Sequence, residues 1–221
     1  MVRFSSLAAS TIALACALAP LNASFAGEPT APVDPEGQRL GALQKAERYD
    51  VSLGGPVRAG GAAVLCKAPL AVVERLATDY GHYVNTIPRF QKSRVVGKKG
   101  GDTDVYLQVP ILHGAATVWS LTRFSPPQRQ GQNVFITSRM IEGNVDDFRG
   151  QWRLRGVDEN QTVVKMELLV VPKFPAPAKV ITSELQGAAA NAAGSLCRRA
   201  EQLTREAAAM QASSAPAPAA P

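Results

Sequence analysis

The sequence is poor in the residues that build metal and redox centres, since its 221 residues include only three cysteines and two histidines. These residues form no close cluster along the chain, which argues against a zinc or an iron–sulfur site, and we expect no cofactor. Only 19% of the residues are charged whereas 46% are hydrophobic, a balance that excludes a wholly disordered protein. Beyond the first twenty-odd positions, no apolar run approaches the ~20 residues that a membrane-spanning helix needs. A chain of this length is expected to form one domain with its own core.

The short motifs of several functional classes are missing as well. The chain has no nucleophile elbow, no serine–histidine–aspartate arrangement and no glycine-rich phosphate loop, so we assign no catalytic residue. The net charge of +6 is spread along the chain without a nucleic-acid-binding motif, so no nucleic-acid partner is expected.

Residues 1–26 have the layout of a secretory signal peptide. Arg3 gives a positive start, an apolar run extends from Leu7 to Leu21, and residues 24–26 offer a small side chain at each end of the triplet Ser-Phe-Ala. This order of charge, apolar run and small residues predicts cleavage after Ala26 and a periplasmic or secreted protein.

The cysteines fit the same compartment. Cys16 leaves with the signal peptide; its use as a lipidation site is a minor alternative, because Ala13 stands where such sites usually carry leucine. Cys66 and Cys197 remain, and in an oxidising compartment they could form a disulfide. The alternative is two buried free thiols that pack as small hydrophobic groups.

Composition divides the remaining chain into three parts. Residues 27–50 are rich in proline, glycine and charge and are predicted to be a flexible linker with one short helix near residues 40–48. Residues 207–221 are nearly all alanine, proline and serine and are predicted to be a disordered tail. The folded domain is therefore placed at residues 51–206.

The order of predicted elements within this domain indicates an α+β fold. A first strand is followed by two short helices, then by strands separated by turn residues and by one long amphipathic helix. Strands joined by short turns form an antiparallel sheet, and a long amphipathic helix can cover its concave face. The strands are predicted at residues 57–67, 92–98, 104–112, 116–124, 133–141, 148–157 and 162–171, and the helices at 71–78, 80–90 and 178–208.

Two glycines interrupt the long helix. Gly187 and Gly194 each cost about 1 kcal/mol relative to alanine in a helix interior. We therefore expect that another segment or a bound ligand lies close to the helix there.

The chain resembles the START-type lipid-binding domains and is similar, more narrowly, to bacterial polyketide-cyclase/START proteins grouped with the coenzyme-Q-binding proteins. The motifs that carry the resemblance cover most of the predicted domain in the family's order, although each is loose by itself. They are residues 69–79 with Tyr80, Tyr83 and Pro88, residues 143–148, residues 150–154, residues 162–164 and residues 172–175.

The resemblance implies the helix-grip fold, in which a curved antiparallel sheet of about seven strands wraps around a long C-terminal helix. In this family an apolar tunnel between sheet and helix binds lipids, sterols, quinones or polyketides, and a few members catalyse cyclisation or hydrolysis. The resemblance implies a hydrophobic small molecule or lipid as the partner, and the mildly basic net charge is compatible with transient contact to an anionic membrane surface. The oligomeric state is left open.

The alternation of side chains along each strand selects the residues expected to line the tunnel. We choose the apolar face of each strand, the helix residues that face it, and aromatic or cationic side chains near the tunnel ends. In the strand at residues 116–124 the phase is ambiguous, and we place Trp119, Leu121 and Arg123 inward. The full set is Tyr80, Tyr83, Val105, Leu107, Val109, Ile111, Trp119, Leu121, Arg123, Phe148, Trp152, Leu154, Met166, Leu168, Val170, Phe174, Ile181, Leu185 and Ala188.

Three functions remain open from the sequence. The first is a non-catalytic carrier or chaperone for a hydrophobic ligand, which would need only apolar contact area. The second is a cyclase or dehydratase on the same fold, which would need an inward cluster of polar groups. The third is an envelope docking module with a filled core and an exposed basic face around Arg149, Arg153 and Arg155.

Overall fold

The computed structural model describes residues 34–51, 59–111, 114, 116–173, 175 and 177–214. The expected signal peptide and Phe174 lie outside these residues. The described chain forms one antiparallel sheet in the order β1-β2-β9-β8-β7-β5-β4-β3, with β6 paired to β7. The strands are β1 (Glu47–Val51), β2 (Ala59–Cys66), β3 (Lys92–Lys99), β4 (Asp102–Ile111), β5 (Ala116–Phe124), β6 (Gln128–Gln130), β7 (Asn133–Gly143), β8 (Val145–Gly156) and β9 (Thr162–Pro172).

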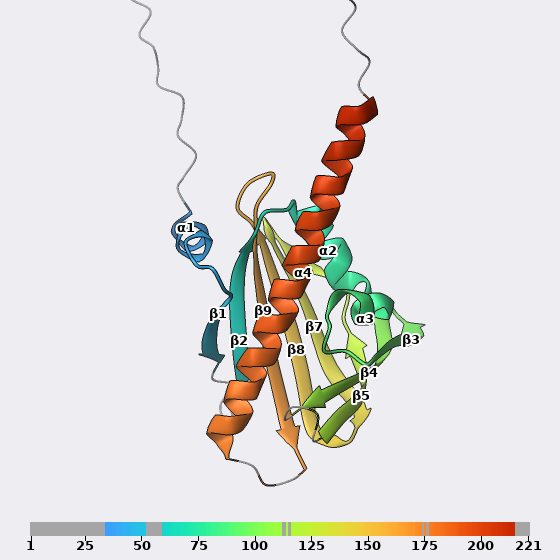
Figure 1. Ribbon diagram of the computed structural model, residues 1–221. Helices are drawn as coiled ribbons and strands as arrows, with labels where there is room; N and C mark the ends of the chain where they lie inside the picture. The colour runs from blue at the N-terminus through green and yellow to red at the C-terminus, as the bar shows by residue number, and fades with distance from the viewer. Residues whose placement is uncertain are drawn as a thin grey trace, which may run out of the picture. The chain divides into compact units, whose positions relative to one another are not determined.

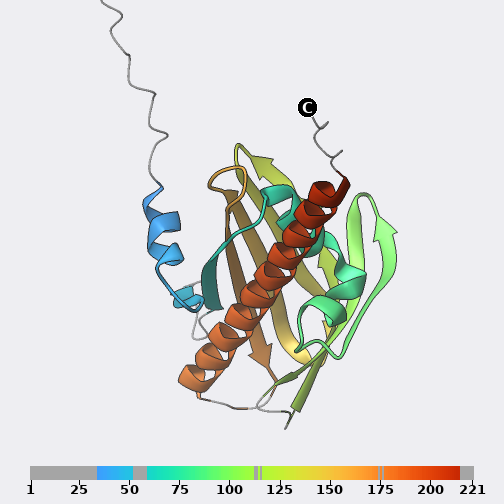
Figure 2. The same cartoon turned by 45° about the horizontal axis from the view of Figure 1, so that its top comes forward.

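The helices lie in two groups. The long helix α4 (Ala178–Ser214) crosses one face of the sheet diagonally, and α2 (Leu70–Thr78), η1 (Tyr80–His82) and α3 (Tyr83–Thr86) lie beside it (Figures 1 and 2). A further helix, α1 (Pro35–Gly41), precedes the sheet. No helix in the described ranges is both long and apolar enough to cross a membrane. The predicted α+β helix-grip architecture is confirmed.

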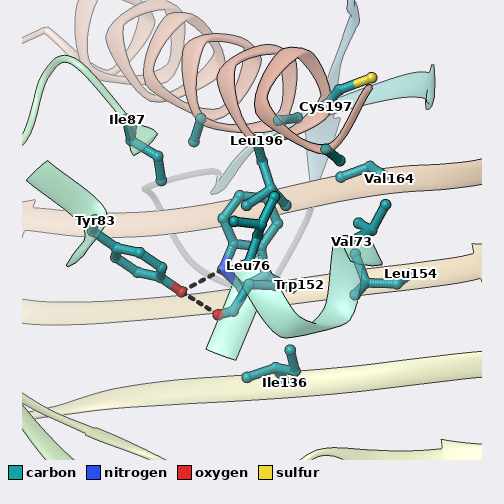
Figure 3. Close-up of a cluster of buried hydrophobic side chains, with 14 of the residues drawn as sticks. Val73, Leu76, Tyr83, Ile87, Ile136, Trp152, Leu154, Val164, Leu196 and Cys197 are labelled. Atoms are coloured by element: carbon teal, nitrogen blue, oxygen red, sulfur yellow. Dashed lines mark hydrogen bonds between the residues drawn. The ribbon is translucent and has the colours of Figure 1, made fainter. Parts of the chain in front are cut away.

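The core fills the space between the sheet, α2 and the middle of α4. Val73 and Leu76 from α2 meet Leu196 from α4 and Trp152 from β8 in one buried cluster (Figure 3). The alternation of β8 explains this arrangement, because Trp152 and Leu154 are buried while Arg153 between them is exposed.

Every strand predicted from the sequence is present, but two further strands, β1 and β6, were missed. β1 lies in the segment that the sequence predicted to be a flexible linker, and the short helix of that segment begins at Pro35 rather than near Leu40. The local composition led to a wrong prediction here, because contacts with residues far away in the sequence hold this segment in the fold. Leu40 is 3% exposed against Ala63 and Val163, and the β1 backbone pairs with β2.

The C-terminal end of α4 also differs from the prediction. The helix continues to Ser214, whereas residues 207–221 were expected to be disordered. The side chains from position 205 onward are exposed, so packing does not hold this part of the helix. Alanine has the highest intrinsic helix propensity, and the alanines at 207–209 extend the helix past the sheet (Figure 1).

The strand β3 forms one edge of the sheet, and its pairing with β4 is irregular. The register shifts between Val95 and Gly97, which marks a β-bulge. The strand is mostly exposed and reads Lys-Ser-Arg-Val-Val-Gly-Lys-Lys.

A network of ion pairs fastens α1 to the sheet. The guanidinium of Arg155 on β8 donates hydrogen bonds of 2.9 Å to Asp34 and 2.9 Å to Glu36, and the ammonium of Lys165 on β9 lies 2.5 Å from the other oxygen of Glu36. Burial disfavours the ionised carboxylates, but the bonds and charges of the two cations outweigh it and leave the pKa values of Asp34 and Glu36 below their ordinary ones.

We expect this network to stabilise the protein at neutral pH and to fail in acid. A carboxylate with a lowered pKa contributes stability above its ordinary pKa of about 4, and the contribution is lost as the pH falls through the lowered value. The double variant Asp34→Asn/Glu36→Gln should therefore have a lower free energy of unfolding than the parent at neutral pH, and the difference should be smaller near pH ~3. Urea denaturation of both proteins at both pH values measures this difference. An equal difference at the two pH values would contradict the prediction.

Candidate ligand-binding cavity

An apolar cavity of about 110 Å³ lies between the sheet and the first half of α4. A cavity of roughly 10–15 Å³ is enough to hold one water molecule. This cavity could therefore hold a ligand group several times as large as a water molecule. The wall combines residues of five strands, β4, β5, β7, β8 and β9, with residues of α4 and of the segment around α3. The residues concerned are Tyr83, Ile87, Arg89, Phe90, Leu107, Val109, Pro110, Ile111, Val118, Ser120, Phe124, Ser138, Phe148, Gly150, Trp152, Met166, Leu168, Val170, Glu184, Leu185, Ala188 and Ala192.

Small side chains on α4 leave this space open. Ala188 and Ala192 face the cavity, whereas one to two turns further along the helix Leu196 is fully buried in the filled core. A methyl group at each of the first two positions reaches only a short distance from the helix. The change from alanine to leucine along one helix face therefore separates the cavity from the packed core.

The buried polar groups of the wall already have partners within the protein. Tyr83 donates a hydrogen bond of 2.5 Å from its hydroxyl to the carbonyl of Ala77 and accepts one of 3.2 Å from Nε1 of Trp152 (Figure 3). Ser138 donates to the Gly150 carbonyl at 3.2 Å. Among the described residues, no buried side-chain nitrogen or oxygen lacks a hydrogen-bond partner. The wall thus offers apolar contact without a free buried donor.

Burial makes the tyrosine hydroxyls poor acids. It raises the pKa of Tyr80 to about 12 and raises the pKa of Tyr83 further, with the neighbouring Tyr80 adding to the shift. Neither hydroxyl is therefore suited to give or take a proton at neutral pH.

Many of the predicted tunnel residues do face the cavity. The sequence correctly separated the two faces of β4, β8 and β9, and it selected positions of α4 that lie opposite them. The predicted residues that line the cavity are Tyr83, Leu107, Val109, Ile111, Phe148, Trp152, Met166, Leu168, Val170, Leu185 and Ala188.

Others belong to the filled core or lie beside the cavity. Val105 and Leu154 are buried in the core cluster. Tyr80 stacks on Phe124 with ring centroids 4.3 Å apart. Ile181 is half-buried near the start of α4 but is not among the lining residues.

The inward orientation expected for Trp119, Leu121 and Arg123 is wrong. Opposite residues of an antiparallel pair share a face, and Val118 lies opposite Val109, which lines the cavity. The alternate residues of β5 therefore face outward. There Trp119 stacks on Tyr106 with centroids 6.2 Å apart.

Arg123 is held on this outer face by an acidic partner. Its guanidinium donates two hydrogen bonds, of 2.7 and 2.8 Å, to the carboxylate of Asp104. These bonds and the positive charge lower the pKa of Asp104. Arg123 is therefore unavailable as a head-group ligand at the cavity.

The sequence did not identify the two charged residues of the wall. Arg89 lies in the turn between α3 and β3, where no periodicity indicates a direction, and Glu184 is on the first half of α4. Their side chains form an ion pair with 3.6 Å between Nη2 and Oε2.

The two cysteines meet between β2 and α4 but are free thiols. Cys66 donates a hydrogen bond of 3.4 Å to the carbonyl of Cys197, and the Cys197 thiol lies 3.4 Å from Oε1 of Glu201. The hydrogen bond with Cys66, together with burial and the nearby negative charge, raises the pKa of Cys197. Two thiols and one carboxylate lie within 4.8 Å of one another, and the hydrogen bonds of the thiols to the Cys197 carbonyl and to Glu201 account for this spacing.

The close approach expected at Gly187 and Gly194 occurs elsewhere. A Cβ at Gly187 would meet no atom within 4 Å, and one at Gly194 would meet only the flexible end of Arg198. The helix instead touches the sheet at Gly60 of β2, where a Cβ would lie 2.3 Å from the backbone nitrogen of Gln186. The small residue needed for this contact is on the strand.

Comparisons with known proteins agree with this architecture. Residues 66–193 match the family model described as polyketide cyclase/dehydrase and lipid transport. A search of the curated proteins found no match.

Solved structures share the fold at low sequence identity. A START superfamily protein from Mycobacterium smegmatis is 16% identical, with a TM-score of 0.58 over 66% of this chain and 98% of that one. The ZhuI aromatase/cyclase from Streptomyces sp. R1128 is 16% identical, with a TM-score of 0.56 over 73% and 98%. A STAR-related lipid transfer protein from Xanthomonas axonopodis is 15% identical, with a TM-score of 0.59 over 72% and 96%. Because the family model spans more than half of the sequence, the chain belongs to the polyketide cyclase/dehydrase and lipid transport family.

Proposed function

We propose that the protein is an exported, non-catalytic carrier that holds a hydrophobic ligand between the sheet and α4. The observation that carries this proposal is the apolar cavity whose buried polar groups are all bonded within the protein. A lipid, an isoprenoid quinone or a polyketide-like molecule would meet the requirement of an apolar body. Export rests on the signal-peptide pattern of residues 1–26.

Contact area alone can supply useful affinity in such a site. Removing apolar surface from water contributes about 25 cal/mol per Å², so burying ~300 Å² of a ligand returns on the order of 7 kcal/mol before the entropic cost of binding. No placed donor is needed for this gain, whereas a polar substrate entering the cavity would lose its hydrogen bonds to water without replacement.

The alternatives receive less support from the site. A cyclase needs a group that can transfer a proton to the substrate, and the hydroxyl of Tyr83 is already committed to Ala77 and Trp152. A docking module would present an unpaired basic face. Instead, Arg149 lies against Asp147 and Arg153 against Glu167, and Arg155 lies against Asp34 and Glu36 at the start of α1.

Filling the cavity should abolish binding while the fold is kept. In the variant Ala188→Phe the ring would occupy the space that the ligand needs, so the affinity for the uncharged fluorophore N-phenyl-1-naphthylamine should fall by at least about tenfold, the equivalent of about 1.4 kcal/mol. A fluorescence titration measures the affinity, and circular dichroism checks the fold.

Ala208→Phe is the matched control, because it makes the same change on an exposed part of the same helix. It should bind the fluorophore like the parent protein. Unchanged binding by Ala188→Phe, or absence of any binding by the parent, would contradict the carrier proposal. Solvent extraction of protein from its host, followed by mass spectrometry, should recover an apolar ligand.

A further inference from the structure

Charge is confined to one place on the described cavity wall. Arg89 and Glu184 are the only lining residues with charged side chains, and all others there are apolar or neutral. Their side chains are 30% and 28% exposed, so the pair lies where the cavity meets solvent. The wall therefore changes from apolar to charged at its rim.

The ion pair leaves the hydrogen-bonding capacity of Arg89 unused. The distance of 3.6 Å exceeds the 2.7–3.2 Å of a good N–H···O bond. Arg89 also makes no hydrogen bond to any other residue within the described ranges. By contrast, Arg123 and Arg155 each make short bonds to carboxylates. A guanidinium has five N–H donors in a planar fork that fits an oxyanion.

The neighbours of Arg89 and Glu184 connect this charge to the apolar cavity. Ile87 and Phe90, on either side of Arg89 in sequence, line the cavity, as do Leu185 and Ala188 next to Glu184 on α4. An apolar chain lying along these side chains would bring a polar group at its end to the guanidinium.

We infer that Arg89 binds the carboxylate of a long-chain carboxylic acid whose apolar chain occupies the cavity. This inference rests on the proposed carrier function and adds the chemical class of the ligand. The carboxylate of Glu184 lies 3.6 Å from the guanidinium, so a group of this size and single charge fits beside Arg89. A phosphate monoester would bring up to two negative charges beside Glu184 and would be repelled more strongly than the single charge of a carboxylate.

Two ligands with the same apolar chain, one charged and one neutral at the head group, test the assignment. Dodecanoic acid and methyl dodecanoate have the same chain, and only the acid is ionised at neutral pH. Displacement of N-phenyl-1-naphthylamine should show that the parent protein binds the acid at least about tenfold more tightly than the ester, because hydrogen bonds to a charged group are stronger than neutral ones.

Variants of the two charged rim residues test whether Arg89 causes the preference for the acid over the ester. In Arg89→Gln the ratio of acid to ester affinity should fall to about one, since the amide has no charge. Glu184→Gln should keep or increase the ratio, because it removes the competing carboxylate. Arg94→Gln, which changes an exposed arginine of β3, is the matched control and should keep the parent ratio.

Each outcome has a separate meaning. Equal affinity for acid and ester in the parent, or an unchanged ratio in Arg89→Gln, would overturn the role of Arg89 and leave the carrier function intact. Failure of both ligands to displace the fluorophore would overturn the carrier function itself. Dodecyl phosphate bound more tightly than dodecanoic acid would overturn the choice of a carboxylate.

Discussion

Replacing Gly60 by alanine is expected to lower the free energy of unfolding by about 3 kcal/mol, because it adds a methyl group where α4 rests on β2. The new Cβ would lie 2.3 Å from the backbone nitrogen of Gln186 and 2.6 Å from the carbonyl carbon of Leu185. A side chain could rotate away, but these backbone atoms move only with the helix. Urea denaturation measures the loss.

The same substitution at Gly187 is the matched control. This glycine lies inside α4 with no atom within 4 Å of its Cβ position, so Gly187→Ala should raise the free energy of unfolding by about 1 kcal/mol through helix propensity. The same chemical change is thus expected to lower the free energy of unfolding at Gly60 and to raise it at Gly187. Equal effects of the two variants would show that the helix does not press on β2 at Gly60.

Truncating Trp152 is the second change with a large expected effect. Its side chain is 2% exposed and packs in the core cluster between β8, α2 and α4 (Figure 3). Removing a buried aromatic side chain of this size typically costs 3–5 kcal/mol, so Trp152→Ala should lose about 4 kcal/mol of unfolding free energy.

Two further variants separate the parts of this effect. Tyr83→Phe keeps the packing but removes the hydroxyl between Trp152 and Ala77, and leaving buried polar groups unpaired should cost about 1–3 kcal/mol. Trp119→Ala removes the other tryptophan, which stacks on Tyr106 on the outer face, and should cost much less than Trp152→Ala. A loss for Trp119→Ala as large as that for Trp152→Ala would contradict the assignment of the core.

The sequence predicted the elements of the fold well where one face of a strand is clearly apolar. In β8 the three arginines share one face, as do Lys165 and Glu167 in β9, so alternation alone selected Trp152 and Met166 as inward. In β5 both faces carry large apolar residues, Val118 and Phe124 on one and Trp119 and Leu121 on the other. The alternation of side chains does not distinguish the two faces of such a strand. Only the register of β5 with β4 shows which of its side chains face the cavity.

Other features depend on contacts that local sequence does not encode. The segment before β2 looks like a linker by composition, yet its Asp34 and Glu36 reach Arg155, more than a hundred residues away. Arg89 stands in a short turn, where no repeat tells which way a side chain points. The family resemblance, rather than periodicity, indicated a cavity, because a strand alternates in the same way over a hollow and over a solid core.

The irregular edge strand β3 has a consequence for how the molecule behaves in a crowded solution. An unpaired strand edge can add a strand from another molecule and so begin aggregation. Here an approaching copy would meet Lys92, Arg94, Lys98 and Lys99 with identical charges of its own, and the bulge between Val95 and Gly97 would break the continuity of the new hydrogen-bond ladder. The exposed valines at the centre of β3 are thus flanked by cations that disfavour self-association at this edge of the sheet.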